Sequence, residues 1–179
     1  MRPDPVRRSL VLILLVSLLT GCLGDTPERV SLRPLSVLAS GDRQHLLIEQ
    51  ELNLSRTMLT ALANGVDLYL GYEVSGCDQP GSIIAWHTVA LRYAPLRRAY
   101  EVDQGALGVR RFSRRSAMLA ALERIRIVLP ANLPAKCNGS LRMVLDLTRL
   151  PTPLRFPALL RPAEWRLVSP RVSWQTSDV

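Results

Sequence analysis

Apolar and polar residues alternate along three stretches of the chain. One phase of each stretch is almost wholly apolar, which is typical of a strand with one buried face. The buried phases are expected to comprise Leu46, Ile48, Gln50, Leu52 and Leu54, then Val66, Leu68, Leu70, Tyr72 and Val74, and finally Leu141, Met143, Leu145 and Leu147.

Further strands are predicted where β-branched and aromatic residues are dense. Residues 82–93 form a long run of this kind, and residues 94–96 turn it into a hairpin that returns over 97–103. Residues 107–112 and 166–174 are also expected to be strands. The last of these belongs at a sheet edge, because Pro170 cannot donate a backbone hydrogen bond.

Two short helices interrupt the strands. Ser55 is a good N-cap for a helix over 56–64 that ends at Asn64-Gly65, and Ser113 is expected to cap a helix over 114–124. Prolines at 151, 153, 157 and 162 predict an extended C-terminal region. The expected fold is therefore mainly β (α+β): an antiparallel β-sandwich-like domain with two short helices. The inward helix residues are expected to be Met58, Leu59 and Leu62, and Met118, Leu119, Leu122 and Ile125.

The N-terminus has the pattern of a bacterial export signal. Three arginines precede an apolar run over residues 10–19, which is too short to span a bilayer, since a spanning helix needs about 20 residues. Leu19-Thr20-Gly21-Cys22 then resembles a lipobox, in which the Cys22 thiol is acylated and the chain is cut before it. The alternative is a chance cysteine after a signal that is cleaved elsewhere or retained. Leu23 after the cysteine favours the outer membrane over the inner.

These features divide the chain into a signal peptide over 1–21, a lipidated Cys22 with a tether over 22–30, and one β-rich domain over 31–179. Acyl chains such as palmitate would hold it to the membrane. Two cysteines remain, Cys77 and Cys137, and an oxidising periplasm favours a disulfide between them, with two free thiols as the alternative.

Charge comes almost entirely from arginine. The formal net charge is +8, and it falls to +6 when residues 1–21, with three arginines and Asp4, are removed. Two clusters are candidates for binding an anionic partner, although a solvated arginine-rich face is the favoured explanation. Few aromatics lie among them, so nucleic acid is not expected. The candidates are Arg92, Arg97 and Arg98, and Arg110, Arg111, Arg114 and Arg115.

Nothing in the sequence assembles a known catalytic motif, and no catalytic residue, metal ligand or cofactor is predicted. His87 beside Trp86 fits a strand face better than a catalytic triad. Carboxylates at alternating strand positions (Glu49, Glu51, Asp67 and Glu73) could be a glycosidase pair, but exposed strands often carry such charges. Asp146 is expected to form a buried pair with a nearby arginine that holds the turn over 151–154.

Several segments together resemble the secreted bacterial family called domain of unknown function 4390. They are "ALANGVDLYL", "AWHTVALRYAPLRRAYEV", "FSRRSAMLAALERI", "LRMVLDLTRLPTPL" and "EWRLVSPRVSW", and the resemblance covers most of residues 31–175. Asp146, Pro151, Pro153, Trp165 and Trp174 belong to its most telling pieces and are taken as structural residues. The resemblance implies export and a gene neighbourhood shared with a membrane histidine kinase. It implies no activity.

The expected function is that of an uncharacterised, periplasm-facing lipoprotein at the cell envelope. It would be a non-enzymatic interaction module, held to the membrane by a lipid anchor and accessory to an envelope protein such as a sensor kinase. The alternatives are binding or handling of envelope lipid or lipopolysaccharide, and an unrecognised hydrolase.

Overall fold

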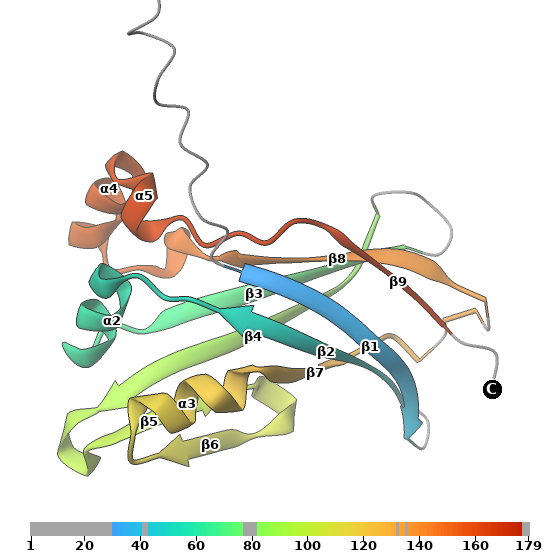
Figure 1. Cartoon of the computed structure of the whole chain (residues 1–179), viewed down its shortest axis with the longest axis horizontal. Coiled ribbons are helices and arrows are strands. Elements are labelled where there is room, and N and C mark those ends of the chain that lie inside the picture. Colours follow the sequence, from blue (N-terminus) through green and yellow to red (C-terminus); the bar gives the residue numbers. More distant parts are fainter. Residues whose placement is uncertain (1–29, 41–42, 77–81, 132, 135, 177–179) are drawn as a thin grey trace, which may run out of the picture.

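Two antiparallel β-sheets form the protein in the computed structural model, which describes residues 30–40, 43–76, 82–131, 133–134 and 136–176. The smaller sheet has the order β1-β2-β7, with β1 Val30–Ser40, β2 Arg43–Leu52 and β7 Arg124–Val128. The larger sheet has the order β6-β5-β4-β3-β8-β9 (Figure 1). Its strands are β3 Leu68–Gly76, β4 Ile83–Ala94, β5 Ala99–Asp103, β6 Val109–Phe112, β8 Asn138–Leu145 and β9 Val172–Gln175.

The core contains residues of both sheets and of four helices. Leu46 and Ile48 of β2 are buried, and the predicted inward residues on β3 and β8 are buried as well, so the inward phases predicted for these strands are confirmed. On β3 and β8 these residues are Leu68, Leu70, Tyr72, Val74, Leu141, Met143 and Leu145. A polar contact joins the sheets within this core, because the hydroxyl of Tyr72 donates to Oε1 of Gln50 at 3.0 Å. Burial raises the pKa of Tyr72, which keeps its hydroxyl protonated as a donor. The mainly β, sandwich-like fold predicted from the sequence is therefore confirmed.

Helix α2, Arg56–Ala63, begins as the sequence predicts. The Ser55 side chain accepts a hydrogen bond from the backbone of Met58 at 3.1 Å, and Gly65 takes a positive φ of 82° just after the helix ends. The hydroxyl of Ser55 also donates to the backbone oxygen of Glu164 at 2.6 Å. One residue thus caps α2 and fastens it to the C-terminal region.

The second predicted helix is shorter than expected. Helix α3 spans Arg115–Leu122, and Arg114 rather than Ser113 precedes it, without a side-chain cap. Ile125 is buried as expected, but it lies on β7, where it pairs with Ile48 of β2. The β-branched residues Ile125, Ile127 and Val128 favour a strand here.

The extended C-terminal region predicted from the prolines is wrong in part. Helix α4 spans Thr152–Leu160, and α5 spans Pro162–Trp165. Pro153 lies in the first turn of α4, where no backbone donor is needed, and Pro157 costs α4 one internal hydrogen bond. The strand predicted over 166–174 shortens to β9 at the sheet edge, and Val168 adds a single bridge to Val144.

The predicted signal peptide, the lipobox (Leu19, Thr20, Gly21 and Cys22) and Cys77 lie outside the described residues, so the predicted division of the chain stays a prediction. β1 begins at Val30, next to the predicted boundary. Among the helices in the described ranges, none has the length and apolar character needed to cross a membrane.

Candidate anion-binding surface

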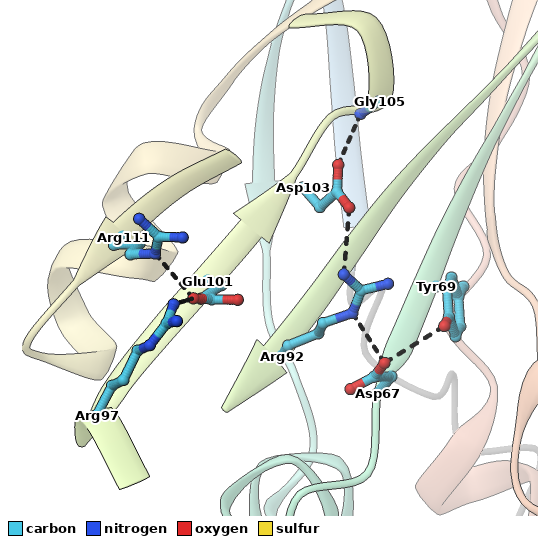
Figure 2. A network of polar contacts seen from close by, with 8 residues as sticks. All are labelled: Asp67, Tyr69, Arg92, Arg97, Glu101, Asp103, Gly105 and Arg111. Carbon is cyan, nitrogen blue, oxygen red and sulfur yellow. Dashed lines mark hydrogen bonds and ion pairs between the residues drawn. The ribbon is translucent and has the colours of Figure 1, made fainter. Parts of the chain in front are cut away.

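Arg92 of β4 is held between two carboxylates. Its Nε donates to Oδ2 of Asp67 at 2.9 Å, and one terminal nitrogen donates to Oδ2 of Asp103 at 3.2 Å (Figure 2). Tyr69 donates to the same oxygen of Asp67 at 3.3 Å. Hydrogen bonding with Tyr69 and then Asp67 raises the pKa of Arg92, so the guanidinium stays charged. We infer that its ion pairs stabilise the fold.

Glu101 of β5 holds two more of the candidate arginines. Its Oε1 accepts from Nε of Arg111 at 2.9 Å and lies 3.6 Å from a terminal nitrogen of Arg97. Glu101 lies opposite Arg92 on one side and opposite Arg111 on the other in the strand register.

These side chains form a row of alternating charge across the outer face of the larger sheet. In order they are Asp67, Arg92, Glu101 and Arg111. Opposite charges on neighbouring strands contribute about 0.2–1 kcal/mol per pair, and salt weakens partly exposed pairs. We call this row the charge ladder, and we infer that Arg92, Arg97 and Arg111 support the sheet.

The other four candidates are differently placed. Arg98, Arg110, Arg114 and Arg115 are all exposed, and no ion pair joins them to a carboxylate of the described residues. We call them the exposed arginines. Arg98 follows the 3₁₀ turn Pro95–Arg97 with a positive φ of 48°, and Arg110 lies over the ring of Phe112 at 5.2 Å. Arg114 and Arg115 lie at the start of α3.

The carboxylates considered as a glycosidase pair are divided between the two sheets. Glu49 and Glu51 lie on β2, whereas Glu73 lies on β3 and Asp67 just before it. Glu49 lies 3.7 Å from Arg124, and Glu73 lies 3.5 Å from Arg171. Three of the four therefore face arginines. In the described ranges, no group of three His, Cys, Asp or Glu side chains is arranged to hold a metal ion.

His87 lies on β4 with its ring 6.3 Å from that of Tyr72. Its Nε2 is buried without a hydrogen-bond partner, and no hydrogen bond or ion pair links His87 to a carboxylate of the described residues. Burial lowers the pKa of His87 from its ordinary value of 6.5.

We expect His87→Gln to weaken the pH dependence of stability on the acidic side of neutrality. Because the pKa of His87 is lowered on folding, the unfolded chain binds the proton more readily between that lowered pKa and 6.5. Lowering the pH from about 7.5 to about 5.5 should therefore reduce the free energy of unfolding more for wild type than for the variant. Urea titrations at both pH values measure it, and equal losses in wild type and variant would contradict it.

Asp146 does not form the buried pair that was expected. Its Oδ2 lies 3.9 Å from Nε of Arg149, and the side chains are 27% and 53% exposed. Asp146 instead accepts hydrogen bonds from the backbone and hydroxyl of Thr148, at 3.0 and 2.6 Å, and so caps the 3₁₀ turn Leu147–Arg149. Arg155 holds the following turn by donating to the backbone oxygen of Leu150 at 2.7 Å. Trp165 and Trp174 are buried, whereas Pro151 and Pro153 are exposed.

Two hollows lie away from the charge ladder. One, of about 430 Å³, lies between β1, β2 and α3, and its lining includes Glu49, Glu51 and Glu123 with one arginine, Arg33. The other, of about 500 Å³, lies between β1, β8 and β9 and is lined by Leu35, Leu46 and Trp174 among others. The acidic lining of the first disfavours phosphate groups there.

A family model described as a domain of unknown function (DUF4390) matches residues 28–175. The chain belongs to this family. The match spans every described strand and helix, and it confirms the resemblance seen in the sequence. No curated protein and no solved structure matches the chain. Family membership therefore brings no activity and no site residue to this chain.

Sequence reasoning considered Asp67 only as a possible glycosidase carboxylate and did not single out Glu101 or Asp103. Glu101 and Asp103 lie on the predicted return strand, and Asp67 precedes another predicted strand. Their alternation with hydrophobic residues was a usable signal for one exposed face. The choice of arginine partners depends on strand register, which the pattern alone does not define.

Proposed function

We propose that this protein is a lipid-anchored interaction module that faces the periplasm at the cell envelope. The observation that carries the proposal is the order of three features: a basic start, a ten-residue apolar run, and Leu19-Thr20-Gly21-Cys22. Seven residues then separate Cys22 from Val30, where β1 begins, so the tether spans at most about 28 Å. A domain on so short a tether works close to the bilayer. Leu23 favours the outer membrane as its location.

The exposed arginines support an acidic protein partner. Four guanidinium groups without a described carboxylate partner suit carboxylates or phosphates on another molecule. A membrane sensor kinase remains the partner suggested by the family resemblance. Handling of envelope lipid or lipopolysaccharide is the second candidate, but the hollow beside α3 is lined by glutamates and gives it no support.

A disulfide between Cys77 and Cys137 is part of the proposal. Gly76 and Gly139 are paired in register where β3 ends and β8 begins, and Cys77 directly follows Gly76. Cys137 is buried one residue before β8. The pairing of Gly76 with Gly139, which are neighbours of these two positions in the sequence, supports the proposed disulfide, and the periplasm would oxidise the pair.

We expect Cys22→Ser to abolish lipidation and processing. The full chain is expressed in a bacterium with a lipoprotein pathway and labelled with an alkyne fatty acid. Wild type should carry the label, run at the size of the cut form and stay in the membrane fraction. Cys22→Ser should carry no label and accumulate as the longer precursor, because the thiol that receives the lipid is gone.

The matched control is Cys77→Ser, which should keep both label and processing. Label that persists in Cys22→Ser, or that is missing from wild type, would contradict the proposed lipid anchor at Cys22. Crosslinking of the wild-type protein in its own membranes then tests the interaction role. An arginine-to-serine change at Arg98, Arg110, Arg114 and Arg115 should reduce the crosslinked partner.

A further inference from the structure

Helix α4 presents its largest apolar side chains to solvent. Phe156, Leu159 and Leu160 are 68%, 66% and 66% exposed. They follow the spacing i, i+3 and i+4, which places them on one side of the helix. We call them the α4 face. Ala158 is buried in the core, and Leu154 packs against the core. The side of α4 opposite the α4 face is therefore the side that holds the helix to the domain.

This arrangement reverses the usual amphipathic pattern. A helix on the surface of a soluble domain normally turns its large apolar residues inward. Full burial of a Leu or Phe side chain contributes about 1.5–3 kcal/mol. The α4 face therefore has apolar surface to bury against something outside the described domain.

Exposed arginines lie on α4 and close to it in the sequence. Arg149, Arg155, Arg161 and Arg166 are exposed and lie on α4 or within six residues of it. The acids nearby are Asp146 and Glu164, and their distances to Arg149 and Arg161 are long, at 3.9 and 3.8 Å. Apolar side chains flanked by arginines match the interface of a bilayer with anionic headgroups.

The start of the folded domain lies toward the same end as α4. Val30 pairs with Leu52, three residues before Ser55, and Ser55 bonds to Glu164 of α5. Figure 1 shows α2, α4 and α5 together at one end, with β1 starting toward them and running away from them. The seven residues between Cys22 and Val30 would thus hold this end nearest the membrane.

We propose that the α4 face binds the surface of an anionic lipid bilayer, as a second membrane contact beside the acyl anchor. This inference rests on the proposed function, because the acyl anchor is what brings the membrane close to α4. The contact of α4 with lipid is nevertheless separate from the anchor at Cys22. Three side chains on one short helix form a weak site alone. Held at the surface by the tether, they fix how the domain is oriented.

The test uses the full-length lipidated protein in vesicles of phosphatidylethanolamine and phosphatidylglycerol. The phosphatidylglycerol carries a photoreactive diazirine in its acyl chain, and mass spectrometry maps the lipid adducts. Adducts should concentrate in residues 152–166 and be scarce at Leu96, which is fully exposed elsewhere. Changing Phe156, Leu159 and Leu160 to Ser should reduce those adducts by about tenfold. A tenfold change is expected because the three side chains would no longer contribute to the binding free energy between α4 and the bilayer.

The matched control changes Leu35, Leu96 and Leu107 to Ser, three exposed apolar residues outside α4, and should leave the adducts unchanged. Flotation of the vesicles reports the anchor separately. Protein that floats without adducts in 152–166 overturns this inference and leaves the anchor standing. Protein that does not float but gives these adducts overturns the anchor alone. In native membranes, protein adducts at the α4 face without lipid adducts would overturn the lipid contact in favour of a protein partner.

Discussion

Gly139→Ala is expected to lower the free energy of unfolding by about 3 kcal/mol, because a methyl group has no room between β8 and its neighbours. A Cβ at Gly139 would meet the backbone oxygen of Ser75 on β3, and it would lie 2.6 Å from the ring of Trp174 on β9. Trp174 is buried, so its ring cannot swing into solvent. Both strand pairings of β8 must then shift. Urea or thermal unfolding of the purified protein measures the loss.

Gly71→Ala is the matched control for that change. Gly71 also lies on a central strand, and its added Cβ would also meet a tryptophan ring, that of Trp86. Trp86 is 49% exposed, so its ring can move outward at small cost. We expect Gly71→Ala to cost less than about 1 kcal/mol. Equal losses in the two variants would show that the backbone contact of Gly139 is not the cause.

Loss of the proposed disulfide is expected to cost about 4 kcal/mol, since it would close a loop of roughly 60 residues. Changing both Cys77 and Cys137 to Ala should lower the urea midpoint, and a reducing agent should lower the midpoint of wild type to a similar value. The physical reason is that the crosslink restricts the unfolded chain. Both measurements use the same denaturant titration.

The control for the disulfide is reduction of the double variant, which should have no effect on its midpoint. Alkylation under denaturing conditions without reductant gives a second readout, because a disulfide blocks both thiols. A wild-type midpoint that is unchanged by reductant, together with two reactive thiols, would contradict the crosslink. It would leave the fold and the anchor untouched.

The strands of the core could be predicted because a half-buried strand has period two wherever it lies. β2, β3 and β8 are of this kind. Helix α2 could be predicted equally well, since Ser55 and Gly65 are local sequence signals at its two ends. The end of α3 could not be predicted in this way, because the period-3.6 pattern of apolar residues continues through Ile125. Only the pairing of Ile125 with Ile48 shows that Ile125 is on a strand.

Helix α4 was missed because its prolines look like breaks. Pro153 occupies a position where proline is tolerated, and contacts of Ala158 and Leu154 with the core offset the hydrogen bond lost at Pro157. The candidate site was only half predictable for a similar reason. Sequence identifies the arginines, but strand register decides which of them face Asp67, Glu101 and Asp103.

The strand order has a consequence for how the domain folds. β2 pairs with β7, and β3 pairs with β8, so each sheet joins segments about 70 residues or more apart. Local hairpins such as β1-β2 and β3-β4 can close early, but neither sheet is complete until the last third of the chain arrives. Closing such long loops slows folding. A chain that emerges N-terminus first would therefore expose the apolar sides of β2 and β3 until its end is released.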